Sequence, residues 1–306
     1  MRDKKPLISI IMNCYNSDQY LEEAINSIFF QTYKNWEIIF WDNQSVDRSA
    51  EIVKSYRDQR IKYFYAPTHT TLGEARNKAL EKVNGEFISF LDCDDLYLSE
   101  KLEKTLNAFN ENEIGLVYTN GYTLYNNENK KKVFYKEIQS TGDLFVDWLS
   151  SYQVMIPSVM FRKNVLNDLE YWFDTRFNMI EEFDFFIRIS KKWKVNYCHE
   201  NLCVWRAHVG SLTWTKKEFF EQENKQFLEC IVIKYPEIAN TISLNKFKAK
   251  IAYQEFYNTW NKKNKAERKL LIPYLFVEKR LILVYIFSFL NLNSFNKILK
   301  KLGKNV

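Results

Sequence analysis

The sequence predicts an α/β fold, in which a mostly parallel sheet is flanked by helices and followed by a helical C-terminal extension. Short apolar, β-branched runs alternate with amphipathic segments through the first hundred residues, and residues 216–306 read mainly as helix. Strand alternating with helix at this spacing is typical of βαβ units, which build parallel sheets. With 306 residues, 46% of them hydrophobic, the chain is long enough for one α/β domain with an appendage.

The first strands and helices can be placed from their side-chain periodicity. The first apolar run suits a strand that is buried on both faces. In the next segment Leu21, Ala24 and Ile28 recur at helical spacing, and Ser17 or Asp18 can cap its start. The predicted strands cover residues 6–14, 36–42, 60–66 and 86–92, and the predicted helices cover residues 17–31, 45–57 and 73–83.

The pattern becomes less regular after residue 115. Asp47, which precedes the second helix, is assigned to helix capping. Two domains are expected, with a boundary near Thr215, where the motifs described below stop and basic residues accumulate. The later strands are predicted at residues 115–126, 131–138 and 194–208, the later helices at 146–152, 181–192 and from 216 onward, and the domains at 1–214 and 215–306.

The net charge of +6 conceals a strong asymmetry. From Lys246 onward the chain carries 14 Lys and Arg against 3 Asp and Glu, so this part has a net charge of +11 and the remainder −5. Such a tail indicates an anionic partner surface, although solubility alone also accounts for it. A nucleic-acid partner is not expected, because the charge is confined to an apolar helical segment.

The apolar part of the tail is too short to cross a bilayer. Its uncharged run from Leu281 to Leu292 is about half the required length. A helix lying in the plane of an anionic membrane surface fits better, and a core helix or a dimer contact is the alternative. The basic residues expected to face the head groups are Lys297, Lys300, Lys301 and Lys304.

Acidic residues follow two of the predicted strands. Asp42 ends the second strand, and Asp92, Asp94 and Asp95 follow the fourth. Ligands of open α/β sheets bind at the carboxyl ends of strands. Three carboxylates in four residues repel one another unless a cation compensates, and such oxygen-rich sites suit Mg²⁺ or Mn²⁺ bridging to a diphosphate. Neither glycine-rich phosphate motif is present, so a metal would have to hold a nucleotide diphosphate.

Four fragments stand in a specific order: ISIIMNCYNS with WEIIFWDNQSVDRS, then GEARNKALEKVNGEFISFLDCDD, then IEEFDFFIRI, then WRAHVGSLT. Over residues 6–214 this order resembles the family 2 glycosyltransferases of the GT-A fold. The resemblance implies transfer of a sugar from a nucleotide-sugar donor, with Mn²⁺ or Mg²⁺ as cofactor. UDP is the implied nucleotide, and a glycan or lipid-linked saccharide the implied acceptor, in surface polysaccharide or lipopolysaccharide synthesis.

The resemblance also assigns roles to individual residues. Asp92 and Asp94 match the DxD motif, with Asp92 near the ribose and Asp94 on the metal ion. His208 matches the histidine that completes the metal or diphosphate site, and Arg76 matches a position near the nucleotide or its diphosphate. The nucleotide-base pocket is expected to be lined by Asn13, Tyr15, Asn16 and Asp42.

Glu182 matches the catalytic base, although it departs from the family pattern. Glu stands where Asp is usual, and the extra methylene moves the carboxylate by roughly 1.5 Å. As base, Glu182 would deprotonate an acceptor hydroxyl that attacks the anomeric carbon from the opposite face, which inverts its configuration. An acidic residue at a helix N-terminus is the alternative interpretation, and that position lowers a carboxylate's pKa. Candidate acceptor-side aromatic residues are Trp148, Tyr152, Trp172, Trp205 and Trp214.

Other activities and the location are constrained less directly. A sugar-nucleotide or glycan-binding protein that has lost catalysis stays open because of Glu182, and WRAHVGSLT argues against a nucleotidyltransferase. The five cysteines have no metal-ligand spacing and the N-terminal apolar run is too short for a signal peptide. We therefore expect a cytoplasmic protein, peripheral on the cytoplasmic face of the bacterial inner membrane.

Overall fold

The computed structural model describes residues 5–125, 130–208 and 219–301, and the chain divides into two units. The first unit comprises Met1–Phe145 and Gln153–Ser211, and the second comprises Val146–Tyr152 and Leu212–Val306. A short stretch from within the predicted first domain thus belongs to the second unit. The predicted boundary after residue 214 lies outside the described residues.

One nine-stranded sheet forms the centre of the first unit, as far as the described residues show. The strand order is β3-β2-β1-β4-β8-β6-β9-β5, and β7 pairs with β6. The strands are β1 (Ile8–Cys14), β2 (Trp36–Asp42), β3 (Ile61–Tyr65), β4 (Phe87–Phe90), β5 (Leu96–Tyr97), β6 (Ile114–Tyr125), β7 (Lys130–Val133), β8 (Met160–Arg162) and β9 (Lys194–Ala207).

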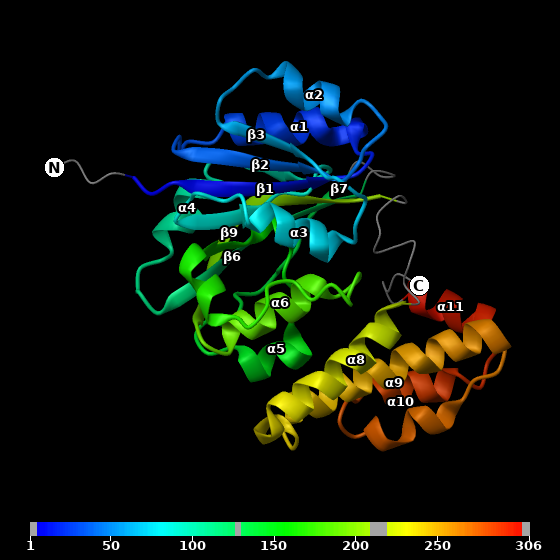
Figure 1. Cartoon of the computed structure of the whole chain (residues 1–306). Helices are drawn as coiled ribbons and strands as arrows, with labels where there is room; N and C mark the ends of the chain where they lie inside the picture. Colours follow the sequence, from blue (N-terminus) through cyan, green and yellow to red (C-terminus); the bar gives the residue numbers. More distant parts are fainter. Residues whose placement is uncertain (1–4, 126–129, 209–218, 302–306) are drawn as a thin grey trace. The chain divides into compact units, whose positions relative to one another are not determined.

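The half of the sheet from β3 to β4 is parallel and follows the predicted βαβ pattern. β1 pairs in parallel with β2 on one side and β4 on the other. Helices α1 (Asp18–Phe29) and α2 (Ser49–Ser55) pack on one face, and α3 (Leu72–Leu80) lies on the other (Figure 1). From β1 the chain adds β2 and β3 on one side of the sheet and then β4 on the other side of β1. The strand order therefore reverses at β1 and β4, and their carboxyl ends form the switch point at which ligands of such sheets bind.

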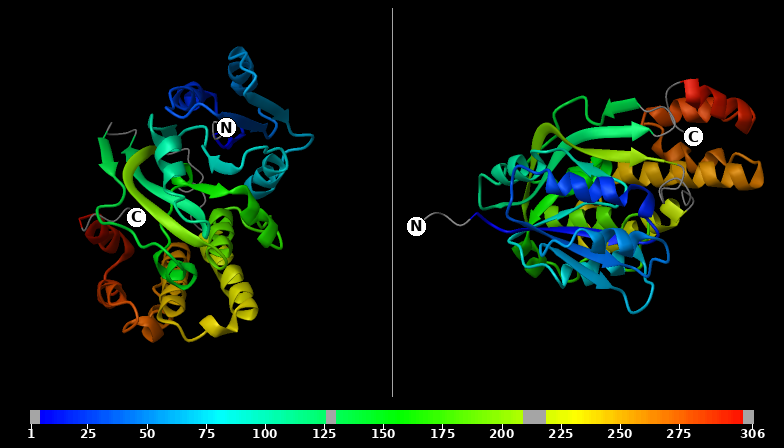
Figure 2. Two further views of the ribbon diagram at one scale, coloured as in Figure 1. Left: turned by 90° about the vertical axis from the view of Figure 1, so that its left-hand side faces the viewer. Right: turned by 90° about the horizontal axis from the view of Figure 1, so that it is seen from above.

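The other half of the sheet is mixed. β8 pairs antiparallel with both β4 and β6, whereas β6 and β9 are parallel. β6 and β9 are long and irregular in register, and Figure 2 shows β9 as a curved ribbon in both views. The sequence did not predict β5 and β8, since two or three residues carry no readable periodicity, and it also missed the seven-residue helix α4 (Lys101–Asn107).

The remaining elements of the first unit are α6 (Glu181–Ser190) and the 3₁₀ helices η1 (Ile156–Ser158) and η2 (Lys163–Asp168). Asp47 precedes Arg48, the N-cap residue of α2, and acts as a capping residue through its side chain. Its carboxylate accepts hydrogen bonds from the backbone N–H groups of Ser49, at the start of α2, and Asp18, at the start of α1, at 3.0 and 2.9 Å. One carboxylate therefore stabilises the N-termini of two helices.

The second unit is helical where it is described, as the sequence predicts. One of its hydrophobic clusters contains Phe256 and Trp260 with Leu281 and Phe295. No helix among its described residues, or elsewhere in the described chain, is long and apolar enough to span a membrane. Its elements are α5 (Phe145–Ser151), α8 (Phe219–Lys234), η3 (Pro236–Ile238), α9 (Ile242–Lys263), η4 (Arg268–Leu270), η5 (Ile272–Tyr274), α10 (Arg280–Phe287) and α11 (Leu292–Lys301).

Candidate active site

The predicted site residues of the first unit gather at the carboxyl ends of the parallel strands. Asn13 lies near the end of β1, and Asp42 is the last residue of β2. The acidic segment from Asp92 to Asp95 follows β4, which is the other neighbour of β1. The topology therefore brings the two acidic segments to one edge of the sheet, as expected for a ligand site.

Asp42 is fully buried and held by two donors. The Tyr63 hydroxyl donates to its Oδ2 at 2.7 Å, and the Ser45 backbone N–H donates to its Oδ1 at 2.7 Å. Burial, together with the carboxylate of Asp42, raises the pKa of Tyr63, so this hydroxyl stays protonated as a donor. Each carboxylate oxygen still has a lone pair that can accept a further hydrogen bond.

Asn13, near the end of β1, has unused hydrogen-bonding capacity, and Asn16, which follows β1, holds a loop. Asn13 Nδ2 is buried and has no hydrogen-bond partner in the described chain, which leaves a donor for a ligand. Asn16 adopts a left-handed backbone conformation with φ of 50°, and its Oδ1 accepts from the Val46 backbone N–H at 2.9 Å. This hydrogen bond from Val46 to Asn16 therefore orders the loop after β2.

Tyr15 pairs with a residue to which the sequence assigned no role. Its exposed ring lies 4.2 Å from the ring of His69, centroid to centroid. His69 is positioned by Nδ1, which lies 2.9 Å from the Asn43 carbonyl oxygen. The two rings are inclined by 50° to each other, so a planar base can stack on the face of one ring but not on both at once. Neither motif nor spacing marked His69, because its loop has no periodic pattern.

Arg76 connects two motifs that are far apart in the sequence. It is only 2% exposed, and its guanidinium lies 2.7 Å from Glu181 Oε1 and 3.6 Å from Asp92 Oδ1. The rings of Phe90 and Phe173 pack against it, with centroids 5.7 and 5.4 Å from the guanidinium carbon. The cation therefore compensates carboxylates of both acidic motifs in a poorly solvated place.

The DxD segment meets the end of β9 through two further contacts. His208 Nε2 lies 2.8 Å from Asp94 Oδ2, and both side chains are partly exposed. Arg206 donates from its backbone N–H to Asp95 Oδ1 and from Nε to the Asp94 carbonyl oxygen, both at 2.8 Å. Burial raises the pKa of Asp92, although Arg76 opposes this, and burial with the charges of Asp94 and Asp92 raises that of Asp95 well above its usual range.

The Asp94–His208 pair offers an incomplete set of ligands for a divalent ion, which substrate oxygens would have to complete. No cluster of three or more His, Cys, Asp or Glu able to hold a metal occurs among the described residues. Mg²⁺ and Mn²⁺ are, however, commonly held by one or two protein groups together with substrate phosphates and water. An oxygen and an imidazole nitrogen 2.8 Å apart on a partly exposed surface meet that requirement.

Glu182 lies in the first turn of α6, next to the residue that pairs with Arg76. It is half-buried, and burial raises the pKa of its carboxyl to about 8, helped by the negative charge of Glu181 and opposed by Arg76. The effect of the helix N-terminus, which lowers the pKa of a carboxyl group, is therefore outweighed by burial, which raises it. A carboxylate with a pKa near neutrality is a stronger base than an ordinary glutamate.

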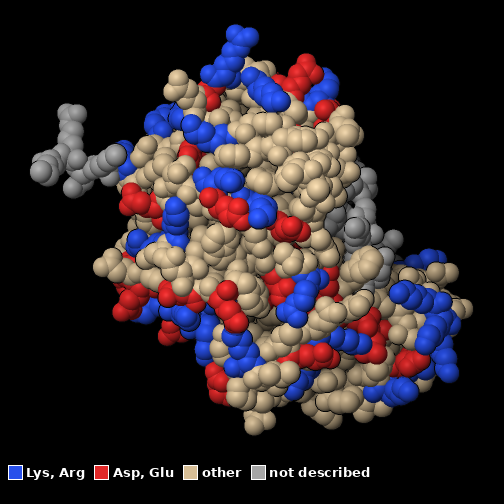
Figure 3. All heavy atoms as spheres, viewed as in Figure 1, with Lys and Arg blue, Asp and Glu red and all other residues tan. Residues whose placement is uncertain are grey.

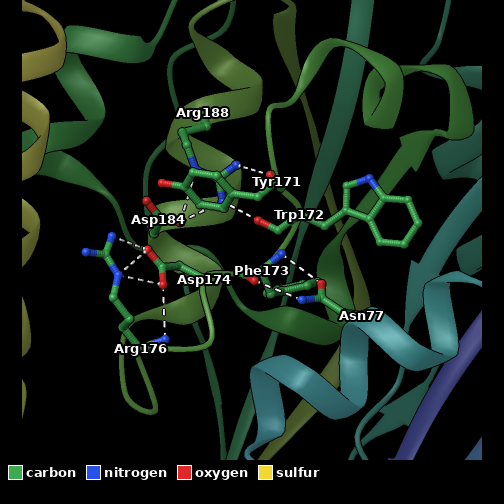
Figure 4. Close-up of polar contacts among 8 residues, drawn as sticks. All are labelled: Asn77, Tyr171, Trp172, Phe173, Asp174, Arg176, Asp184 and Arg188. Carbon is green, nitrogen blue, oxygen red and sulfur yellow. Dashed lines mark hydrogen bonds and ion pairs between the residues drawn. The ribbon is translucent and has the colours of Figure 1, made fainter.

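Residues 171–173, which precede α6, make polar contacts with α6 on one side and with α3 on the other (Figure 4). Arg188 binds Asp184 at 2.6 Å and also donates to the carbonyl oxygens of Tyr171 and Trp172. Asn77, from α3, exchanges two hydrogen bonds of 2.9 Å with the backbone of Phe173. These contacts connect α3 and α6, the helices that contribute Arg76 and Glu182, and sequence spacing did not predict them.

The acceptor-side aromatic residues are placed differently from one another. Trp148 is buried and Trp205 packs against the core. Trp172 is half-buried and lines two grooves of about 540 and 590 Å³, but none of the residues predicted for the donor site, the metal or the base lines either groove. Trp214 lies outside the described residues.

Comparison with known proteins identifies the family. Residues 9–169, more than half of the chain, match Glycosyl transferase family 2, and the chain belongs to this family. An uncharacterised glycosyltransferase of Haemophilus influenzae is 33% identical over 221 residues, which cover 70% of this chain and 84% of that relative. The chain is therefore an enzyme of the glycosyltransferase class.

Two further similarities describe the fold and one relative's reaction. The S. aureus TarS 1–349 structure in complex with UDP-GlcNAc has a TM-score of 0.65 and 20% identity, covering 88% of this chain and 79% of TarS 1–349; it shows the GT-A fold. Escherichia coli WfgD, named a UDP-Glc:alpha-D-GlcNAc-diphosphoundecaprenol beta-1,3-glucosyltransferase, is 38% identical over 121 residues. That match covers 40% of this chain and 47% of WfgD.

Proposed function

We propose that the protein is a metal-dependent inverting glycosyltransferase that moves a sugar from a UDP-sugar to a lipid-linked saccharide during cell-surface glycan synthesis. One observation carries this proposal. Arg76 joins the DxD segment to the start of α6, and beside that junction Glu182 has a pKa raised to about 8. A donor site and a base are thereby held on connected elements.

The donor is bound by residues at the ends of β1, β2 and β4. Asn13 Nδ2 and Asp42 offer a donor and an acceptor to the nucleotide base, and Tyr15 with His69 offers a stacking surface. Asp92 binds the ribose, and Arg76 lies beside the diphosphate. Asp94 and His208 would hold Mn²⁺ or Mg²⁺, which supplies charge neutralisation for a departing diphosphate.

Glu182 performs the proton transfer. In its deprotonated form it accepts a proton from the acceptor hydroxyl, whose oxygen then attacks the anomeric carbon opposite the nucleotide diphosphate. One bond to the anomeric carbon forms as the other breaks, so the product has the inverted configuration. If product analysis showed a retained configuration, Glu182 would lose this role.

One relative and the basic tail support the proposed acceptor and location. WfgD is named for an acceptor on diphosphoundecaprenol, so a lipid-linked saccharide is the acceptor we propose here. Such an acceptor lies in the membrane, so the enzyme works as a peripheral protein on the cytoplasmic face of the inner membrane. The basic tail, with a net charge of +11 from Lys246 onward, suits an anionic surface.

Calorimetric titration tests the donor site. UDP and other nucleoside diphosphates are titrated with and without Mn²⁺ into wild type, Asp94→Ala and, as a matched control, Asp147→Ala, which removes a carboxylate of the second unit. Binding of UDP that needs Mn²⁺, is lost in Asp94→Ala and persists in Asp147→Ala is the expected result. If no nucleotide binds, the transferase proposal fails. If UDP binds but none of a panel of UDP-sugars is turned over, the protein is better interpreted as a binding protein that has lost catalysis.

A further inference from the structure

Large apolar side chains are exposed in one short stretch of the second unit. Among the described residues, seven of the seventeen exposed large hydrophobic side chains fall between residues 272 and 290. Phe276 is 92% exposed and Phe289 is 66% exposed. Single exposed apolar residues are common on protein surfaces, but such a concentration marks an interaction surface.

Helix α10 places three of these side chains on one face. Leu281 and Val284 point into the core of the second unit, as expected for one face of a surface helix. The opposite face, which is polar in ordinary surface helices, carries exposed Ile282, Leu283 and Ile286. A helix that is apolar on both faces needs an apolar environment on each, and the core supplies only one of them.

The end of α10 holds part of this surface in place. Arg268 donates from Nε to Ser288 Oγ at 2.9 Å, and its guanidinium lies 4.0 Å from the centre of the Phe289 ring. A cation at a helix C-terminus is favourable, so this contact is stable. It fixes Phe289 while most of the ring stays exposed. We define the docking row as Phe276, Ile282, Leu283, Ile286, Phe289 and Leu290.

The charges around the docking row are mostly positive. Residues 268–301 contain seven Lys and Arg and one acidic residue, Glu278, which pairs with Arg280 at 3.6 Å. Lys269, Lys279 and Lys297 are exposed. In Figure 3, Lys and Arg side chains, drawn in blue, gather along the right-hand edge of the second unit. The side chains of Lys300 and Lys301, and all of Lys304, lie outside the described part of the chain.

We propose that the docking row is a membrane-binding site, which inserts its Phe, Leu and Ile side chains between the acyl chains of an anionic bilayer while the neighbouring basic residues bind lipid phosphates. Apolar insertion and basic contacts together are what an interfacial helix requires, and the row is too short to span a bilayer. The inference deepens the proposed function, because it assigns the membrane location to named residues.

Vesicle co-sedimentation of the full chain tests the site. The probes are vesicles of phosphatidylethanolamine with phosphatidylglycerol, and vesicles of phosphatidylcholine alone. The test variant is Phe276→Ser/Leu283→Ser, and the matched control is Ile233→Ser/Ile242→Ser, which removes two exposed isoleucines elsewhere in the same unit. We expect the test variant to lower partitioning into anionic vesicles by roughly a hundredfold, since two large apolar side chains no longer leave water. The control is expected to partition like wild type.

Three results would overturn the proposal: no binding of wild type to anionic vesicles, equal binding of the test variant, or equal binding to phosphatidylcholine. A dimer that Phe276→Ser/Leu283→Ser converts to a monomer, without vesicle binding by wild type, would instead identify the row as a contact between copies. UDP titration of every variant separates this test from the transferase proposal. Vesicle binding without UDP binding supports the docking row and removes the donor site, and the reverse result removes only the docking row.

Discussion

At Glu182 two effects on one carboxyl group oppose each other. The N-terminus of α6 favours the charged form by about 0.3–1 kcal/mol, which is less than one pKa unit. Burial and the charge of Glu181 favour the protonated form, and the pKa rises to about 8. Burial therefore decides the outcome. It also supports the proposal that Glu182 serves as the base where the family usually has Asp, since a raised pKa gives a stronger base.

The pH dependence of the reaction should report this carboxyl group. As the proposed base, Glu182 can accept a proton only when it is deprotonated, so kcat/KM is expected to rise with pH and level off above about pH 8. Glu182→Gln should lower kcat by about 10²–10⁴-fold and abolish this rise of kcat/KM with pH, the acid limb of the profile. UDP release with a saccharide acceptor, measured between about pH 6 and pH 10, gives both quantities.

Glu182→Asp is the matched control, because it keeps the carboxylate and should retain a pH limb at reduced rate.

Stability gives a second readout with a defined sign. The folded-state pKa lies above the unfolded value, so the native protein binds more protons and loses stability as pH rises from about 4.5 to about 8. Glu182→Gln should remove that loss in urea unfolding. An unchanged acid limb in Glu182→Gln would assign the limb to another group.

At the scale of elements, Arg76 connects α3 with the DxD segment and with α6. Glu181 is almost fully buried beside it. Arg76→Met leaves that carboxylate without its cation and should lower the free energy of unfolding by about 3–5 kcal/mol. It should also move the acid limb of Glu182 to higher pH, because Arg76 lowers the pKa of Glu182. Urea unfolding and the pH profile measure the two effects.

The double variant Arg76→Met/Glu181→Met separates an ion pair from general packing. Both partners are then apolar, so much of the lost stability should return, although donor binding should not. A double variant as unstable as Arg76→Met alone would mean that Arg76 acts through its packing on Phe90 and Phe173.

The elements that could be predicted from sequence are those with a long, clear period. β1, β2 and α1 were found in this way, because burial selects apolar residues along most of each strand and along one stripe of the helix. β8 is three residues long and is defined by its neighbours β4 and β6, so no local pattern reveals it. Strand pairing beyond β4 was therefore outside the reach of sequence reasoning.

The same distinction applies to the candidate site. Asp94 and His208 stand 114 residues apart, and only the family resemblance suggested that they meet, which the structure shows at 2.8 Å. The pair of Arg76 with Glu181 and the contact of Tyr15 with His69 depend on tertiary packing. Sequence spacing does not encode such packing, so neither contact was predicted.

At the scale of the whole molecule, the chain combines two units of different composition. The first has its core around β1, β2 and α1, and the second has a core of its own around Phe256 and Leu281. The segment from Lys246 onward, in the second unit, carries a net charge of +11, whereas the residues before Lys246 carry a net charge of −5. Units with separate cores can unfold separately, and then a single free energy of unfolding does not describe the protein.

Calorimetric unfolding should therefore show two transitions that respond to different changes. UDP with Mn²⁺ at a hundredfold excess over its Kd should raise only the transition of the first unit, by roughly 5–10 °C. Leu281→Ala, which creates a cavity in the second core, should lower only the other transition. A single transition that UDP raises and Leu281→Ala lowers would mean that the two cores unfold cooperatively. In that case a change in the tail would alter donor-site stability, and tail variants would have to be interpreted with that coupling included.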